Sequence, residues 1–415
     1  MIKLPQSINL KIKQYEYTSL IPLWISTFID IIGFSILIPY LPRFTTDFGA
    51  SLFQVGLLLS ANSFFSLFGN MIWGSLSDKY GRKPILLICQ FGTLTGFIIM
   101  AFSTNLTILF ISRIVDGIFG GNYPIAKAVV GDIVPPDRRS KEMSNIGVAW
   151  TVGNLIGPGI GGLLSGFGIL GPGLFGAGLS LVTILITIFI FRESNPHLTG
   201  TASTAELSAF EKKQAISLSL LKQHDPRLLL IQNLFNNISF FIFITTVSIF
   251  VAQRYDLTPA EIGWMISSMG LIKLLVRFLI FSPMLKRFGD KKTIMIGFIT
   301  FLAAYTWLIF VNQLWEYMTI FVLVGFAAAC TFAVMSGMMS RSVGKERQGE
   351  MMGLSTAADN VSQILGPTLG SYLLSLPSPF LYGISTAAFS LTTLLLGFIP
   401  LQKEKNPAPT QIMNQ

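Results

Sequence analysis

The most constraining feature of this chain is a series of long apolar runs that recurs along its whole length. A helix that crosses a bilayer needs about 20 predominantly apolar residues, and twelve runs come near or exceed that length. Because lipid offers the backbone no hydrogen-bond partner, we predict that each run is a helix. The runs are 19–42, 52–76, 85–102, 106–128, 143–167, 173–191, 228–252, 261–282, 293–311, 315–340, 351–375 and 381–400.

The composition supports a surface that faces lipid. Charged residues make up 12% of the 415 residues, half of the roughly 25% that is usual in soluble domains. The two cysteines, Cys89 and Cys330, lie in separate apolar runs, so we predict buried thiols, with neither a disulfide nor a metal site.

The basic residues are distributed unevenly between the two sides of the predicted helices. With the N-terminus in the cytoplasm, 23 of the 29 Lys and Arg residues lie in cytoplasmic segments, and only Arg43 and Arg254 lie in outer loops. This bias predicts a multi-pass protein of the cell membrane with both termini in the cytoplasm. It also accounts for the net charge of +9 without nucleic acid, since a basic cytoplasmic side contacts anionic lipid.

One polar stretch, 192–227, divides the runs into six and six. We predict an N-terminal six-helix bundle over 1–191, a cytoplasmic linker with a short amphipathic helix near 205–222, and a C-terminal bundle over 228–415 that ends in a short cytoplasmic tail. The halves share motifs: "IGPGIGG" at 156–162 resembles "LGPTLGS" at 365–371, and "KYGRK" at 79–83 resembles "RFGDK" at 287–291. Transporters are often built from such internal repeats.

Four motifs carry a resemblance to a known family. The second and third runs are joined by G-x-L-x-D-x-x-G-R-K, and the fourth run holds R-x-x-x-G at Arg113 and Gly117. The fifth run holds G-x-x-x-G-P-x-x-G-G, and the first contains "DIIGFSILIPYLP" at 30–42. Over nearly its whole length the chain resembles the major facilitator superfamily, and within it the twelve-helix drug/proton antiporters of the tetracycline-efflux type. The resemblance implies an all-α polytopic membrane protein with two pseudo-symmetric six-helix bundles.

The loop motif predicts a conformational latch at the cytoplasmic side. Asp78 stands at a helix end, and the family pattern implies that it meets the positive N-terminus of the eleventh helix near Met351. Arg82 would hold Asp78, and Asp132 would complete a charge relay. The second-half copy has Lys286 where the first half has Asp78, so we expect the two gates to differ. The latch residues are Gly74, Asp78, Gly81, Arg82 and Asp132.

The fifth-run motif is typical of antiporters in this family and predicts a tight seam with a neighbouring helix. Glycines four residues apart permit close helix contact, and a proline kinks the helix. Packing alone is the alternative role. The motif residues are Gly153, Gly157, Pro158, Gly161 and Gly162.

Ionisable residues inside a membrane are costly and usually functional. Asp30 lies halfway along the first run and is the predicted proton carrier. Arg113 and Asp116 share a face of the fourth helix, where Arg113 would tune the proton affinity of the carboxylates; a structural ion pair is the alternative for Asp116 and for Asp359. The predicted substrate cavity holds Asp30, Arg113, Asn154, Asn236, Asn237, Lys273, Asp359 and Gln363.

These observations favour a secondary transporter that exports amphipathic organic compounds in exchange for protons by alternating access. Lys273 and Arg277, one turn apart, keep open a facilitator or symporter of an organic anion or metabolite, or a translocator of anionic lipid. A non-transporting membrane sensor or chaperone would be expected to lose these intramembrane charges. The sequence has no phosphate-binding loop and no nucleophile motif, so we predict no enzyme and no cofactor, and we expect a monomer.

Overall fold

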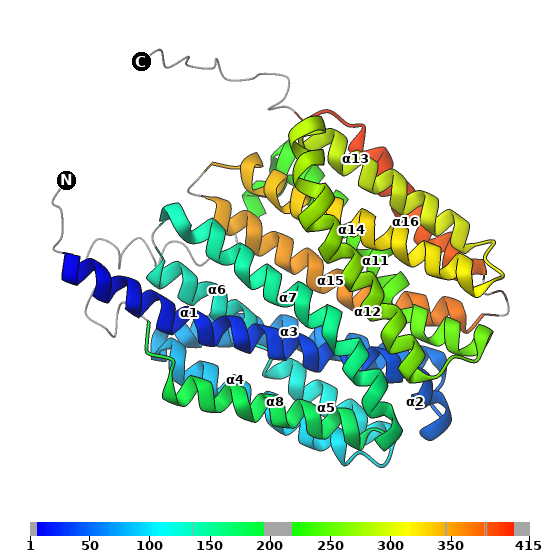
Figure 1. Cartoon of the computed structure of the whole chain (residues 1–415), viewed down its shortest axis with the longest axis horizontal. Helices are drawn as coiled ribbons and strands as arrows, with labels where there is room; N and C mark the ends of the chain where they lie inside the picture. The colour runs from blue at the N-terminus through cyan, green and yellow to red at the C-terminus, as the bar shows by residue number, and fades with distance from the viewer. Residues whose placement is uncertain are drawn as a thin grey trace. The chain divides into compact units, whose positions relative to one another are not determined.

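The computed structural model describes residues 6–134, 136–194, 218–344, 347–376, 378 and 380–401. Within these ranges every regular element is a helix (Figure 1). Most of the predicted linker and the C-terminal tail therefore lie outside the described residues, and α11 already begins at His224, inside the range predicted as linker. The helices are α1 Gln6–Ser35, η1 Ile38–Tyr40, α2 Leu41–Asp47, α3 Leu52–Tyr80, α4 Arg82–Ala101, α5 Leu106–Ile118, α6 Asn122–Ile133, α7 Pro136–Leu164, η2 Ser165–Phe167, α8 Leu170–Phe189, η3 Leu218–Lys222, α11 His224–Tyr255, α12 Pro259–Val276, η4 Arg277–Phe281, α13 Ser282–Leu308, α14 Leu314–Ser342, α15 Gln348–Leu374 and α16 Phe380–Gly397.

The predicted all-α membrane fold is confirmed, and each of the twelve apolar runs falls largely on helical residues. By length and composition, nine helical stretches of the described chain can cross a membrane. One of them, Pro259–Leu308, contains two predicted runs, because α12, the π-helical turn η4 and α13 follow one another without a loop. The fourth run is broken into α5 and α6. The eleventh, α15, carries Glu350 and Asp359 and is not one of these nine stretches.

The chain groups into two compact units. Unit 1 comprises Met1–Phe210 with Val247–Gly270, and unit 2 comprises Glu211–Thr246 with Leu271–Gln415. The grouping divides α11 after Thr246 and α12 after Gly270, so both helices contribute to both units. The bundle boundaries at 191 and 228 stay a prediction.

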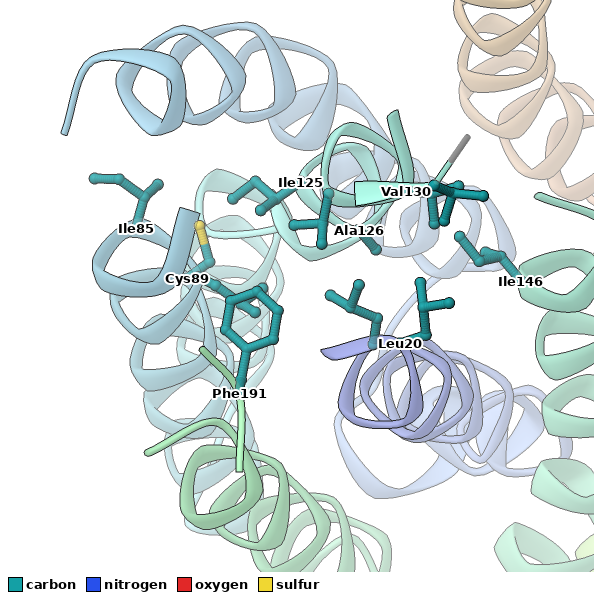
Figure 2. Packing of buried hydrophobic residues seen from close by; sticks show 12 residues of the cluster. Leu20, Ile85, Cys89, Ile125, Ala126, Val130, Ile146 and Phe191 are labelled. Carbon is teal, nitrogen blue, oxygen red and sulfur yellow. The ribbon is translucent and has the colours of Figure 1, made fainter. Parts of the chain in front are cut away.

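The core of unit 1 is aliphatic. α1 lies beside α7 and α8, and α4 packs along α8 and α5. Figure 2 shows the cluster that joins α1, α4, α6 and the segment after α8, with Leu20, Cys89 and Phe191 pointing into it. Cys89 is fully buried, as the sequence predicted for it.

Unit 2 contains a cluster of buried aromatic rings in addition to an aliphatic cluster. Phe243 of α11 packs against Tyr305 of α13 at 5.6 Å and Phe321 of α14 at 5.3 Å between ring centroids. The hydroxyl groups of Tyr317 and Tyr382 lie 3.3 Å apart and give each other a hydrogen-bond partner away from water, as buried phenols require.

The internal repeat is visible in the helix contacts of each unit. In unit 1, Gly157 of α7 lies against the last turn of α1, and Gly161 lies against the backbone of Ile36 directly after it. In unit 2, Gly366 and Gly370, each 209 residues further on, lie against α11. The same small-residue spacing thus gives the same close helix contact twice, which is the structural counterpart of the two similar sequence motifs.

Candidate functional site

The loop between α3 and α4 turns at a single glycine. Gly81 has φ 106° and ψ 151°, a backbone conformation that side chains disfavour. Its amide closes α3 by donating to the Ser77 carbonyl at 3.2 Å, and Arg82 begins α4 immediately afterwards. Gly74, also predicted as a latch residue, makes no close helix contact: among the described residues, no atom lies within 4 Å of the point where its Cβ would stand. Its carbonyl accepts a hydrogen bond from the Ser77 hydroxyl at 2.8 Å.

Arg82 is the centre of a charged triad in this loop. Its side chain is only 4% exposed and forms ion pairs with Asp78, in the last turn of α3, and with Asp132 of α6. Its Nε donates to Asp132 Oδ2 at 2.9 Å, and its Nη1 donates to Ser77 Oγ at 2.7 Å. The structure thus brings together three residues that are separated by up to 54 positions (Asp78 to Asp132) in the sequence. A buried guanidinium between two carboxylates costs several kcal/mol to disrupt.

Glu193 is a further member of this network that sequence reasoning missed. Its two carboxylate oxygens accept the backbone amides of Arg82 and Lys83, at 2.8 and 3.0 Å. Carboxylates favour helix N-termini because they satisfy free amides and face the positive end of the helix dipole. Lys83 also links α4 to α8, because its Nζ donates to the Ile188 carbonyl at 2.9 Å. An acid soon after an apolar run was the available signal, but its partner 111 residues earlier could not be read from the pattern.

Arg113 and Asp116 form a buried ion pair inside the spanning region of unit 1. Arg113 Nη1 lies 3.2 Å from Asp116 Oδ2, and the Arg113 side chain is 2% exposed. Asn62 of α3 donates to the same Asp116 oxygen at 2.8 Å. The guanidinium also lies 5.6 Å from the ring centroid of Phe97, a distance that permits a cation–π contact. The predicted i, i+3 pair on one helix face is present.

Asp30 completes a group that we call the embedded charge cluster: Asp30, Arg113 and Asp116. Asp30 of α1 interacts electrostatically with Asp116 and is hydrogen-bonded by the side chain of Asn122, the first residue of α6. With every member ionised, the cluster holds two negative charges and one positive charge. Binding of one proton therefore makes the cluster neutral, which is the less costly state in a low-dielectric membrane.

Unit 2 contains the remaining polar residues of the predicted cavity except Asn154. Asn233 and Asn237 of α11 both donate to Asp359 Oδ1, at 2.9 and 2.6 Å. Asn236 is buried, and Gln363 lies one turn beyond Asp359 on α15. Asn233 was not among the predicted cavity residues, although it stands one turn before Asn237 on the same helix.

Lys273 of unit 2 lies over an aromatic ring. Its Nζ is 4.8 Å from the ring centroid of Phe332 on α14. Arg277 stands one turn further along, at the start of the π-helical turn η4. In unit 1, Asn154 lies half-buried on α7. That these residues and the embedded charge cluster line one substrate cavity stays a prediction.

The glycine motif of α7 contacts two neighbouring segments of unit 1, one at α1 and one at α12. Gly153, Gly157 and Gly161 face α1, and Ser35 donates to the Gly153 carbonyl at 3.3 Å. Gly162 faces the first turn of α12, where a Cβ would lie 2.6 Å from the Pro259 carbonyl. The carbonyl of Pro158 contacts Gly263 of α12. One helix therefore packs closely on both sides, where larger side chains would separate the backbones.

These features define a polytopic membrane protein of the secondary-transporter type, with a repeated helical architecture, a charged loop triad and ionisable groups within the spans. A model of the Major Facilitator Superfamily matches residues 23–231 and, a second time, residues 229–413. The chain belongs to the Major Facilitator Superfamily, and the family predicted from the motifs is confirmed.

Known proteins resemble the chain over most of its length. Tetracycline resistance protein, class H, of Pasteurella multocida is 27% identical over 369 residues, which cover 86% of this chain and 89% of that protein. Multidrug resistance protein 2 of Bacillus subtilis (strain 168) is 25% identical over 376 residues, which cover 88% and 92%. The solved structure of the human organic anion transporter MFSD10 (TETRAN) matches with a TM-score of 0.69 at 20% identity, over 92% of this chain and 99% of that one. This last likeness concerns the fold alone.

Proposed function

We propose that the chain is a proton-coupled exporter of amphipathic organic compounds that works by alternating access in a cytoplasmic membrane. The observation that carries this proposal is the embedded charge cluster, in which Asp116 pairs with Arg113 and also interacts electrostatically with Asp30. One proton makes the cluster neutral, so its charge can follow proton uptake and release. Relatives named for tetracycline and multidrug resistance support drug-like substrates.

Asp30 is the proton carrier in this proposal, and Arg113 with Asp116 tunes it. Substrate and proton occupy the transporter alternately, so substrate release on one side accompanies proton binding. Substrate selection falls to the predicted cavity residues. The seam residues of α7 limit leakage during the conformational change.

The charged loop triad is the proposed cytoplasmic latch. Asp78, Arg82 and Asp132 hold the end of α3, the start of α4 and the end of α6 together. A contact that exists in only one conformation shifts the equilibrium between conformations by its own free energy. Loss of the latch is therefore expected to change the conformational equilibrium, while the binding residues stay in place.

The first test is proton movement in sealed vesicles. Purified protein is reconstituted with a pH-sensitive dye inside, and tetracycline and a panel of cationic, neutral and anionic amphiphiles are added. We expect substrate-driven proton movement in the native protein and none in Asp30→Asn, with both proteins recovered in equal amounts. Asp256→Asn is the matched control, because it removes a carboxylate from the segment between α11 and α12. Normal proton movement in Asp30→Asn would reject Asp30 as the carrier.

A second candidate function is transport of an organic anion. Lys273 over the Phe332 ring, with Arg277 one turn away, favours it, since two cations attract a carboxylate or sulfonate. The same vesicle experiment separates the two: tracer uptake of anions without proton movement, lost in Lys273→Met, would select the anion carrier.

A further inference from the structure

The fourth membrane helix is interrupted inside unit 1. α5 ends at Ile118 and α6 begins at Asn122, so Phe119, Gly120 and Gly121 leave the helical path. The break leaves the Ile118 carbonyl without its helical partner. The indole of Trp73 in α3 donates to that carbonyl at 2.7 Å and stacks on the Phe119 ring at 5.4 Å. An irregular backbone within a membrane persists only where such partners satisfy it.

The two glycines in the break allow neighbouring helices to approach. A Cβ on Gly121 would lie 2.7 Å from Cβ of Trp73 and 2.9 Å from Sγ of Cys89. A Cβ on Gly120 would lie 2.9 Å from Oγ of Ser66. Residues from α3 and α4 therefore occupy the space around the break, and the start of α6 is held in a fixed position.

Asn122 stands at that start, facing Asp30. It is 5% exposed, and its side chain hydrogen-bonds the Asp30 carboxyl group. Its Oδ1 atom is buried and has no hydrogen-bond partner among the described residues. A buried acceptor without a donor is destabilising. The oxygen is therefore available to a donor that is present only part of the time.

A carboxylic acid that gains and loses a proton is such a donor. The ionised carboxylate only accepts hydrogen bonds, whereas the protonated acid donates one, and a carboxamide can serve as partner to both. Rotation of the amide by half a turn exchanges its NH2 group for its oxygen, and no covalent bond changes. The positive end of α6 adds a preference for the ionised form of a neighbouring acid.

We propose that Asn122 is the positioning residue for the coupling proton: its NH2 group donates to ionised Asp30, and its Oδ1 accepts the O–H of neutral Asp30. This inference rests on the proposed role of Asp30 as proton carrier. The other titratable or charged groups around the pair are Asp116 and Arg113 on α5, Cys89 on α4, and Lys127 on α6. The described α8 and the part of α7 from Ile146 to Leu164 contribute no charged residue.

The test measures the Asp30 proton directly by infrared spectroscopy. Difference spectra between pH values are recorded for the purified full-length protein in lipid nanodiscs, and the carboxyl band that is absent in Asp30→Asn is assigned to Asp30. In Asn122→Leu we expect this band to change frequency, and its titration midpoint to rise by about 0.5–1 pH unit. The direction follows because hydrogen bonds to charged groups are worth about 1 kcal/mol more than those to neutral groups. Asn122→Gln keeps the amide, so its titration midpoint is expected to lie closer to the native value than that of Asn122→Leu.

The control is a second buried amide of the same unit. Gln90 is 1% exposed, donates to Thr187 at 2.9 Å, and also has a side-chain oxygen that finds no partner in the described part of the chain. Gln90→Leu therefore removes comparable polarity without touching Asp30. Its Asp30 band should match the native one. Should Asn122→Leu not fold, Asn122→Ala serves in its place.

An unchanged midpoint and frequency in the Asn122 variants would overturn the inference, and so would an equal shift in Gln90→Leu or the lack of any Asp30 band. Proton transport in vesicles is the separate readout for the proposed function. If the Asp30 band shifts as expected but substrates drive no proton movement, the proposed role of Asn122 is kept and the proposed function as a proton-coupled exporter is rejected.

Discussion

At the residue scale, the loop triad has a charge-inverted counterpart in unit 2. The positions 208 or 209 residues after Asp78, Arg82 and Asp132 are occupied by Lys286, Asp290 and Arg341, and Asp290 forms an ion pair with Arg341. The glycine before the central residue has positive φ in both copies: 106° at Gly81 and 74° at Gly289. The aligned motifs already contain the sign changes at Lys286 and Asp290. That Asp290 pairs with Arg341 could be recognised only from their contact.

The two ion pairs differ in exposure, so we predict that their removal differs in cost. The Arg82 and Asp132 side chains are 4% and 10% exposed, whereas Arg341 and Asp290 are 62% and 41% exposed. Arg82→Ala leaves buried carboxylates uncompensated and should destabilise the protein by about 3–5 kcal/mol. Arg341→Ala breaks a solvated pair and should cost at most about 1 kcal/mol. Thermal unfolding of the purified variants in one detergent measures both, and equal losses would contradict the prediction.

At the element scale, the close contact of α1 with α7 depends on glycine. A Cβ at Gly157 would overlap Oγ of Ser35 and lie 3.1 Å from the Ile32 carbonyl. We predict that Gly157→Ala destabilises the protein by about 1–3 kcal/mol, because the helices cannot keep their distance. Adding Ser35→Ala removes the nearest obstacle and should recover part of the loss, which a double-mutant cycle of melting temperatures detects.

Gly178 of α8 provides the matched control for that experiment. It is exposed, and no described atom lies within 4 Å of its would-be Cβ. Gly178→Ala should be neutral or slightly stabilising, because alanine has the better helix propensity. A similar loss in Gly178→Ala and Gly157→Ala would show that helix contact is not the cause.

The elements differ in how far their sequence reveals them. Long apolar runs identified the spanning helices because length and hydropathy are local properties. The spacing of Gly157 and Pro158 allowed their recognition as a motif. It did not reveal that α7 also packs on α12 through Gly162. The break at Gly120 and Gly121 was missed, because paired glycines are common in membrane helices, and the stabilising donor, Trp73, lies far away in the sequence. Glu193 and Asn122 were not predicted as site residues for the same reason: each gains its role from a partner that is brought near by folding.

At the scale of the whole molecule, the family model matches twice in succession, as the sequence repeat predicted. The contacts show how the copies have diverged. The glycine contact is kept in both units, whereas the loop triad has changed sign and become exposed. Packing that sets helix distance tolerates few residue types, but an ion pair keeps its attraction when both signs are exchanged.

The orientation in the membrane is the last prediction, and the native thiols make it simple to test. Cys89 and Cys330 are both fully buried, so an impermeant maleimide should not react with the native protein. The basic-residue bias predicts that the loop between α13 and α14 faces outward and the one between α14 and α15 faces the cytoplasm. Asn312→Cys and Gly344→Cys place an exposed thiol in each loop. Intact cells should label only Asn312→Cys, and inverted membranes only Gly344→Cys; the reverse pattern would invert the topology and move the charged loop triad to the outer side.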